Sequence, residues 1–386
     1  MRDYEYVVIG LGGIGSAAAY WLARAGADVL GIEQFELGHE RGASQDHSRI
    51  IRLAYHRPEY VRLASHAYDA WTQLETDVGK ALLVRTGGLD LAPAEGAISL
   101  TDYERSLAVE GVPFEALDAH EVMNRWPQFR LSDDVRTVYQ ADAGIAPAAD
   151  CNASHIHAAR EHGAALVENR RVDAVRMGDG EFDLSAGNER FSCRRLVVAA
   201  DAWTNDVLRG LGVRLPLTVT QEQVTYLAAP DAEAFTPSRF PIWIWNDEPS
   251  FYGMPAYGEA GPKVAQDVGG KEVTAGTRTF EPDPENLRRV LEFASAILPS
   301  MVGPVLTTKT CLYTLTPDRD FVIDEIPSAP GAFVALGAAH GFKFASVLGR
   351  ISSELAIDGR TAHDLEMFRM DRPVLLMEDP PRTFFI

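Results

Sequence analysis

A glycine-rich turn between a strand and a helix, all within the first 33 residues, most constrains the fold of this chain. Residues 6–9 are a short apolar run with β-branched side chains, which predicts a buried parallel strand. Residues 10–15 match the pattern G-x-G-x-x-G, and the alanine-rich segment 16–25 predicts a helix that ends at Gly26. A second apolar run, residues 28–33, predicts the next strand. This order of elements is typical of a dinucleotide-binding unit.

Each part of the pattern has a physical role in holding a dinucleotide. Gly10, Gly12 and Gly15 permit a tight turn and a close approach of the backbone to a pyrophosphate, and the helix N-terminus supplies N–H donors. Glu33 follows Gly15 by 18 residues and can accept hydrogen bonds from a ribose diol. The pattern does not separate FAD from NAD. Glu33 counts against NADP, because a carboxylate repels a 2′-phosphate.

The composition limits the partners of the protein. The chain has 386 residues, which predicts two or three domains, and its formal charge of −19 excludes a broad surface for nucleic acid or anionic membranes. The odd number and wide spacing of Cys151, Cys193 and Cys311 fit neither a disulfide framework nor a metal site, so we predict no metal and a reducing compartment. The glycines of residues 7–23 argue against a signal peptide or membrane span. We expect a soluble, cytoplasmic protein.

The rest of the chain predicts two interleaved domains. Strand and helix patterns alternate after residue 146 and again near the C-terminus, whereas strands separated by Pro and Gly turns occupy the segments between. We therefore predict an α/β protein in which a Rossmann-like domain is interleaved with a mostly antiparallel α+β substrate domain. The first domain comprises residues 1–86, 146–216 and 320–386, and the second comprises residues 87–145 and 217–319.

A cluster of arginines between residues 41 and 62 reverses the charge of this acidic chain locally. If residues 49–52 form a helix, Arg49 and Arg52 share one side of it. The apolar Ile50 and Ile51 between them indicate a partly buried site. The alternative is a solvated amphipathic helix.

Two further segments carry a thiol or a cation. Cys311 lies in a predicted strand, residues 308–314, where it reads as a buried and inert thiol. Lys309 could favour a thiolate only if it lay nearby. The second segment, residues 337–345, predicts a helix start with Lys343 in the first turn, where the helix dipole repels cations. This placement indicates a bound anion, and the alternative is a structural turn with Lys343 in solvent.

Lysine is rare in this chain, which makes its positions informative. Only five residues are lysine and 31 are arginine. Lys263, Lys309 and Lys343 all lie in or near the segments that carry potential chemistry. A compact ammonium can approach a reacting centre in ways that a guanidinium cannot.

At these motifs the chain resembles the monomeric sarcosine oxidase and N-methyltryptophan oxidase family of covalent flavoproteins, over nearly its whole length. The motifs that carry the resemblance are the glycine-rich turn with Glu33, Ser48-Arg49-Ile50-Ile51-Arg52, Arg125-Trp126-Pro127, Tyr252-Gly253-x-Pro255 leading to Lys263, Cys311-Leu312-Tyr313-Thr314, Asp320-Phe321-Val322-Ile323-Asp324 and His340-Gly341-Phe342-Lys343-Phe344. The resemblance implies that the first domain binds FAD, joined through its 8α-methyl to the sulfur of Cys311. It also implies a monomer.

The resemblance assigns roles to individual residues. Lys263 activates oxygen, and Arg49 lies beside the flavin. Arg52 and Lys343 bind the substrate carboxylate, and Tyr252 and Tyr313 line the amine pocket. The residues implied to hold the cofactor are Gly10, Gly12, Gly15, Glu33, Ser48, Arg49, Val172, Cys311, Gly341 and Lys343. The implied reaction is oxidation of a sarcosine-like N-methyl α-amino acid to an imine and formaldehyde, with O₂ reduced to H₂O₂.

Three departures from the family pattern widen the choice of substrate. A histidine is usual four residues after the oxygen-activating lysine, and here that position is Asp267. A His-His-Gly-Asp-Thr stretch before the first arginine is replaced by residues 45–48, Gln-Asp-His-Ser, and a glycine before Ala-Trp is replaced by Asp201. Asp267 would favour a more cationic amine or a polyhydroxyl group. Oxidases of fructosyl amino acids or of cyclic imino acids such as pipecolate and proline are therefore alternatives, followed by an NAD-dependent dehydrogenase and a non-catalytic flavin-binding protein.

Overall fold

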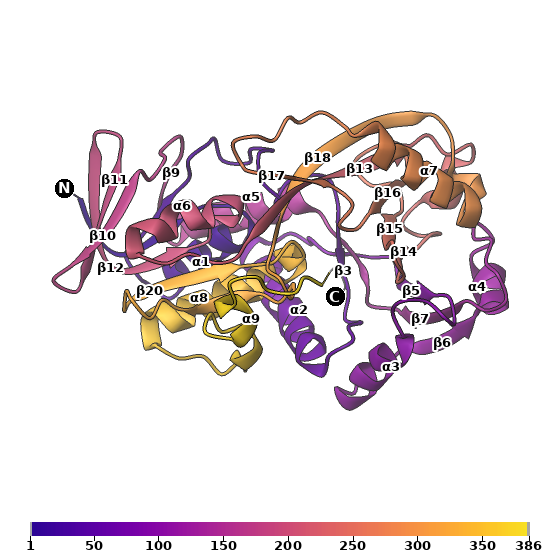
Figure 1. Ribbon diagram of the computed structural model, residues 1–386, viewed down its shortest axis with the longest axis horizontal. Helices are drawn as coiled ribbons and strands as arrows, with labels where there is room; N and C mark the ends of the chain where they lie inside the picture. Colours follow the sequence, from indigo (N-terminus) through magenta and orange to yellow (C-terminus); the bar gives the residue numbers. More distant parts are fainter. Residues whose placement is uncertain (1, 384–386) are drawn as a thin grey trace.

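The computed structural model describes residues 2–383, and three β-sheets organise this part of the chain. The two large sheets lie toward opposite ends of an elongated molecule, as Figure 1 shows. The first sheet has the strand order β10-β11-β12-β1-β2-β9, with β20 beside β12 and β19 beside β20. Its strands are β1 (Arg2–Ile9), β2 (Val29–Ile32), β9 (Ala165–Val167), β10 (Ala174–Gly178), β11 (Glu181–Ala186), β12 (Glu189–Val198), β19 (Val322–Glu325) and β20 (Ala332–Leu336).

Parallel pairing at the centre of the first sheet explains its continuous apolar runs. β1 pairs in parallel with both β2 and β12, and β12 pairs in parallel with β20. Helices cover such a sheet, so both faces of its strands are buried. Helix α1 (Gly13–Arg24) packs against α5 (Ala148–Glu161) and α8 (Ala345–Asp358). The glycine-rich turn joins β1 to α1, as the sequence predicts.

The second sheet is antiparallel except where β14 pairs with β5. Its order is β17-β13-β16-β15-β14-β5-β7-β6, with β18 along the other side of β13. Its strands are β5 (Gly88–Ala92), β6 (Glu115–Asp118), β7 (Arg136–Gln140), β13 (Thr218–Leu227), β14 (Ile242–Trp245), β15 (Phe251–Met254), β16 (Lys263–Gln266), β17 (Lys271–Val273) and β18 (Val305–Leu315). Helix α7 (Pro284–Ile297) packs on it, with Phe293 stacked 4.0 Å from Phe251 between ring centroids.

A small third sheet corrects one expectation from the sequence. Residues 49–51 form strand β3 (Arg49–Ile51), not a helix, and β3 pairs with β8 (Gly144–Ala146), which also pairs with β4 (Val84–Arg85). The helix on which Arg49 and Arg52 would share one side is therefore not formed. Both arginines nevertheless line one cavity, described below.

The helix expected near Lys343 is also shifted. A 3-10 helix, η5 (Gly341–Phe344), comes first, and α8 begins at Ala345. Lys343 therefore precedes the α-helix instead of occupying its first turn. The remaining helices are α2 (Pro58–Val78), α3 (Leu100–Val109), α4 (Ala119–Arg125), α6 (Thr204–Leu208) and α9 (Pro373–Leu376), and the other short 3-10 helices are η1 (Asp201–Trp203), η2 (Arg209–Leu211), η3 (Ala232–Phe235), η4 (Pro299–Met301) and η6 (Glu366–Phe368).

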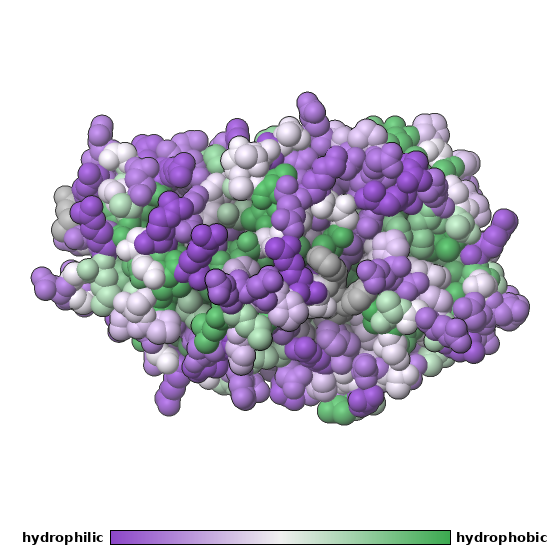
Figure 2. All heavy atoms as spheres, viewed as in Figure 1, coloured by the Kyte–Doolittle hydropathy of each residue, from purple (hydrophilic) through white to green (hydrophobic). Residues whose placement is uncertain are grey.

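The predicted fold class, an α/β protein with a Rossmann-like unit and a second, mostly antiparallel sheet, is confirmed. The exact domain limits stay a prediction, and their outermost residues, 1 and 384–386, lie outside the described residues. Between residues 2 and 383, every helix is too short or too polar to cross a membrane. The surface in Figure 2 is mostly hydrophilic, with small apolar areas.

A close helix contact fixes α1 against α8. Gly349 of α8 lies so near α1 that an added Cβ would stand 2.4 Å from the Cβ of Ala17 and 2.6 Å from its carbonyl carbon. Ala17 is fully buried, so neither helix has room to give way. The contact fixes the position of α1, and therefore of the glycine-rich turn at its N-terminus, relative to α8.

We predict that Gly349→Ala destabilises the protein by about 1–3 kcal/mol, because the added methyl group must push two packed helices apart. Urea unfolding followed by circular dichroism measures this loss. Ile357→Ala, at a 40% exposed position of the same helix, is the control and should change stability by less than about 0.5 kcal/mol. A fully stable Gly349→Ala variant would contradict the close contact.

Candidate active site

Two joined cavities run from the first sheet to the space between the two large sheets. The larger has a volume of about 1340 Å³, counting its open mouth, and the smaller about 830 Å³. The residues that line both cavities are Gly12, Ala43, Ser44, Ala199 and Asp201. Their walls include the chain just beyond the carboxyl ends of β1, β2 and β12, the edge at which open α/β sheets bind ligands. We call the joined cavities the slot.

The smaller cavity has the features of a nucleotide site. Glu33 is 5% exposed and lies on its wall, where its carboxylate accepts hydrogen bonds from the N–H groups of Leu11 at 2.8 Å and Phe35 at 3.2 Å. Burial opposes ionisation of Glu33, but hydrogen bonds from His39 and these N–H groups lower its pKa overall. Val172 lines the same cavity. An ionised acid is therefore available for a ribose diol.

The turn itself can accept only glycine at two positions. Gly10 has φ +89°, in the left-handed region, and an added Cβ at Gly15 would stand 1.8 Å from the carbonyl oxygen of Gly10. Gly10 and Gly12 line the smaller cavity, whereas Gly15 supports the turn from behind. The backbone can therefore approach a pyrophosphate closely. Together with the length of the slot, this cradle fits a dinucleotide whose second half extends into the larger cavity.

Asp201 stands where the two cavities meet. It has φ +43°, and burial raises the pKa of its carboxyl to about 6. This is the position at which the family pattern has glycine, and the positive φ explains that preference. A carboxyl with this pKa is still mostly ionised at pH 7, so Asp201 is best suited to a hydrogen-bond donor of the ligand rather than to its phosphate groups.

One end of the second sheet brings four of the predicted residues together. Tyr252 lies on β15, Lys263 on β16, and Cys311 and Tyr313 on β18. Cys311 and Tyr313 are two residues apart and share a face of β18. Tyr252 and Tyr313 line the larger cavity, and Cys311 lines an adjoining cavity of about 380 Å³ that shares Arg49 with it.

Cys311 is partly buried among cations. Burial raises the pKa of its thiol to about 11, and the charge of Arg49, with a smaller contribution from Lys263, opposes that rise. Lys309 instead contacts carboxylates, with its Nζ 3.2 Å from Glu259. The cationic surroundings of the thiol thus come from Arg49 and Lys263, not from the lysine two residues away.

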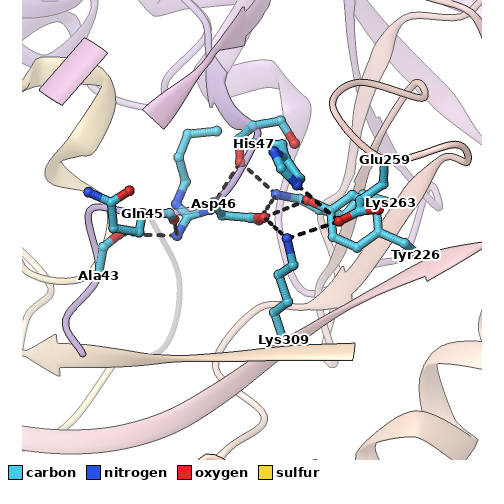
Figure 3. A network of polar contacts seen from close by, with 10 residues as sticks. Ala43, Gln45, Asp46, His47, Tyr226, Glu259, Lys263 and Lys309 are labelled. Atoms are coloured by element: carbon cyan, nitrogen blue, oxygen red, sulfur yellow. Dashed lines mark hydrogen bonds and ion pairs between the residues drawn. The ribbon is translucent and has the colours of Figure 1, made fainter. Parts of the chain in front are cut away.

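Lys263 is buried, with its side chain 1% exposed, and it does not line either cavity of the slot. Its Nζ donates to the Asp46 carboxylate at 2.8 Å and to the Ser48 carbonyl at 2.6 Å. Figure 3 shows this network. Ser48 therefore contributes a backbone oxygen, and it lines neither cavity of the slot. Arg49 also donates to the Ser48 carbonyl, at 3.0 Å.

Two cations face the other end of the larger cavity, and they differ in availability. Arg52 is 5% exposed and forms an ion pair with Asp90, a buried acid of β5. Asn246 donates to the same carboxylate at 3.2 Å. Lys343 donates to the His340 carbonyl at 3.2 Å. Burial lowers the pKa of Lys343 to about 7, and the charge of Arg52 adds to that effect.

Asp267 lines the larger cavity as well, and it has a cationic partner. The buried guanidinium of Arg319 donates to its Oδ2 at 2.9 Å. Gly341 lines the same cavity at the start of η5. Polar groups of both signs therefore surround the tyrosine rings at the inner end of the slot.

The comparisons with known proteins agree with this geometry. The family model DAO, FAD dependent oxidoreductase, matches residues 5–355. The chain belongs to the FAD dependent oxidoreductase family. The monomeric sarcosine oxidase of Streptomyces avermitilis is 34% identical over 381 residues, which covers 95% of this chain and 96% of that protein. The N-methyl-L-tryptophan oxidase of Salmonella arizonae is 30% identical over 375 residues, covering 96% and 99%.

A solved structure supports the fold. The open form of NikD, an unusual amino acid oxidase essential for nikkomycin biosynthesis, superposes with a TM-score of 0.85 at 24% identity and covers 100% of this chain and 99% of its own. The predicted resemblance, the FAD cofactor and an FAD-dependent amine oxidase are confirmed. The alternative of an NAD-dependent dehydrogenase is rejected, because the matching family is FAD dependent. Covalent attachment, H₂O₂ formation and the monomeric state stay predictions.

The sequence did not predict the roles of three residues in the site of this oxidoreductase. Asp46 binds Lys263, Asp90 binds Arg52, and Arg319 binds Asp267. Asp90 had a visible signal, since a lone acid in the apolar segment Gly88–Ala92 needs a partner when buried. The two other pairs join residues far apart in sequence, on different elements.

We predict that carboxylate binding to the oxidoreductase depends on a protonated Lys343. Acetate, which has no titrating amine, should bind best below pH 7 and weaken by up to about tenfold per pH unit above it, as Lys343 loses its proton. Lys343→Met should weaken binding at pH 6 by about 10- to 100-fold and remove this pH slope. Changes in the flavin absorbance spectrum on titration with acetate measure both effects.

Lys343→Arg is the matched control, because a guanidinium keeps its charge throughout this pH range. It should retain binding at pH 9, where the unaltered protein has lost most of it. The same pH slope in Lys343→Met as in the unaltered protein would show that another group controls binding.

Proposed function

We propose that the chain oxidises a secondary, N-methyl α-amino acid of the sarcosine type, with O₂ as the acceptor and H₂O₂ as a product. For an N-methyl substrate, the amine, O₂ and water give the primary amine, formaldehyde and H₂O₂. The observation that carries the proposal is the placement of a Lys343 ammonium and two tyrosine rings in one cavity at the inner end of the FAD slot. The relatives named for sarcosine and N-methyltryptophan support the substrate class.

Lys343 and Arg52 orient the substrate through its carboxylate. Among residues 2–383, the ammonium of Lys343 has one hydrogen-bond acceptor, the His340 carbonyl, so it can form a charge-assisted hydrogen bond with a carboxylate. Arg52 is already neutralised by Asp90. Its Nε, however, is a buried donor with no hydrogen-bond partner in the described part of the chain, and a carboxylate oxygen would satisfy it.

The tyrosines hold the amine end of the substrate. Tyr252 and Tyr313 line the cavity between the carboxylate site and Arg49. Aromatic faces attract a methylammonium and also accommodate its neutral form. When bound, FAD supplies the two-electron acceptor chemistry that ordinary side chains lack. The protein's contribution is to fix the amine and exclude water around it.

Lys263 serves the oxygen reaction. A fixed ammonium stabilises negative charge that develops on oxygen as it is reduced. Lys263 lies next to Arg49 and close enough to Cys311 to influence the pKa of its thiol. In this scheme the oxygen reaction uses a cation other than Lys343. The substrate carboxylate and O₂ therefore have separate cations.

Asp267 favours a second candidate substrate. A carboxylate on the cavity wall, held by Arg319, can accept hydrogen bonds from hydroxyl groups or attract a more cationic amine. An oxidase of fructosyl amino acids uses the first property, and an oxidase of cyclic imino acids such as pipecolate or proline needs no methyl group. The same Lys343 carboxylate site serves all three substrate classes.

A screen for H₂O₂ release separates these candidates. We expect release with sarcosine or N-methyltryptophan, and the panel should also include pipecolate, proline and fructosyl amino acids. Catalase must abolish the signal. Asp267→His, which introduces the residue usual in the family, should shift the preference away from fructosyl substrates if Asp267 binds their hydroxyl groups. No H₂O₂ and no anaerobic bleaching of the flavin with any of these amines would favour a non-catalytic flavin-binding protein.

We predict that Cys311→Ala abolishes covalent attachment of FAD. After acid precipitation, the unaltered protein should keep its yellow colour in the pellet, whereas the variant should release FAD to the supernatant. Cys193→Ala removes a thiol that is buried in the first sheet and is the matched control, which should keep the flavin bound. Acid-stable flavin in Cys311→Ala would place the attachment at another residue.

A further inference from the structure

One carboxylate, that of Asp46, has contacts from four separate strands beside the slot. The Oδ2 of Asp46 accepts from Lys263 at 2.8 Å and from Arg49 at 3.2 Å. Its Oδ1 accepts from the Tyr226 hydroxyl at 2.7 Å and lies 3.5 Å from the Nζ of Lys309. The sticks in Figure 3 converge on this side chain. Asp46 lies within residues 45–48, the segment that departs from the family pattern.

The backbone at Asp46 is strained, which suggests that its side chain has a function. Asp46 has φ 108°, well inside the region that favours glycine. Strain of this kind persists only where the surroundings fix the residue, and it concentrates at functional sites. Its carboxylate makes most of the contacts that hold Asp46, and its backbone carbonyl also accepts a hydrogen bond from the Ala149 N–H at 3.3 Å. Glycine would remove the strain, so the carboxylate must provide something that offsets its cost.

Lys263 is the partner that most needs the carboxylate. Its ammonium is buried, and its acceptors are the Asp46 carboxylate and the Ser48 carbonyl. Burial lowers the pKa of Lys263 to about 8, attraction by Asp46 opposes this, and repulsion by Arg49 adds to it. Without the carboxylate, a cation as near as Arg49 would favour the neutral amine.

We propose that Asp46 is a positioning residue that holds Lys263 in place as an ammonium during the reaction with oxygen. The inference rests on the proposed role of Lys263. Asp46 touches neither substrate nor oxygen in this scheme, and it acts through the charge and orientation of Lys263.

The groups around Asp46 keep it ionised. Burial opposes its ionisation, but the charges of Lys263 and Arg49 and the hydroxyl of Tyr226 hold its pKa well below the usual range. Lys309, from β18, also contacts Glu259 at 3.2 Å, and Glu259 lies 3.0 Å from His47. This outer set balances the charge of Lys309. A change in pH above neutrality therefore acts on Lys263 rather than on Asp46.

The rarity of lysine permits a direct test on the holoenzyme. Labelling with lysine that carries ¹³C at Cε gives five signals, from Lys80, Lys263, Lys271, Lys309 and Lys343. Lys263→Met assigns the Lys263 signal by its loss. The titration of that signal against pH then reports the protonation of Lys263 without reference to activity.

We expect Asp46→Asn to lower the titration midpoint of Lys263 by about one pH unit or more, because an opposite charge at this distance has been removed. Glu259→Gln, which removes a carboxylate that contacts Lys309 but not Lys263, is the matched control and should shift the midpoint much less. An unchanged midpoint in Asp46→Asn would overturn the inference. Equal shifts in the two variants would also overturn it, because they would show a general effect of net charge.

Asp46→Gly gives a second variant that suits the backbone at this position, in case Asp46→Asn does not fold. It should show the same shift in midpoint while unfolding at an equal or higher temperature, because the strain is removed. A lower midpoint together with a lower unfolding temperature would show that Asp46 supports the fold as a whole, and would count against a role confined to Lys263.

Rates of the oxygen reaction separate this inference from the proposed function. The amine-reduced holoenzyme is mixed with O₂ in a stopped-flow instrument across the pH range. Asp46→Asn should slow the reaction about fivefold or more at pH 8 and much less at pH 6, where Lys263 stays protonated. If Lys263→Met reacts with O₂ as fast as the unaltered protein, the proposed role of Lys263 is wrong. If only Lys263→Met is slow, the role of Asp46 is wrong.

Discussion

The ion pair between Asp46 and Lys263 joins the two halves of the site. Asp46 lies in the loop that follows β2 of the first sheet, and Lys263 begins β16 of the second. Arg49, from β3, shares the same carboxylate, so all three sheets meet at this point. The position of the glycine-rich turn relative to the tyrosine-lined cavity depends on this contact. A buried pair of this kind is costly to break from one side only.

Charge compensation is the common rule around the slot. Lys263 has Asp46, Arg52 has Asp90, and Arg319 has Asp267. Lys343 is the exception among these cations, since its hydrogen-bond acceptor is a carbonyl oxygen. Burial of an unbalanced ammonium lowers its pKa toward neutrality. Lys343 is therefore the cation of the site that is available to bind an anionic ligand. The acidic residues of the exterior do not neutralise it.

Features that depend on neighbouring residues in the sequence could be predicted, whereas contacts between distant segments could not. The turn, Glu33 and the alternation of strands are local patterns, and they predicted the cofactor class and fold class. The lysines near motifs predicted the region of the site, although residues 49–52 proved to be extended and Lys343 preceded its helix. Asp46, Asp90 and Arg319 were missed because their partners lie far away in the chain, and a pattern within one segment carries no record of them.

The contact of Gly349 with Ala17 has a consequence for how the protein is made. The glycine-rich turn is translated first, but α8, η5 and β20 complete the slot only after nearly the whole chain exists. Until then, α1 lacks one of its two helix neighbours, α8, and β12 lacks one of its two parallel neighbours, β20. Pairing of such distant segments is slow compared with local folding. FAD that meets the glycine-rich turn before residues 332–358 have folded onto it therefore finds only part of its site.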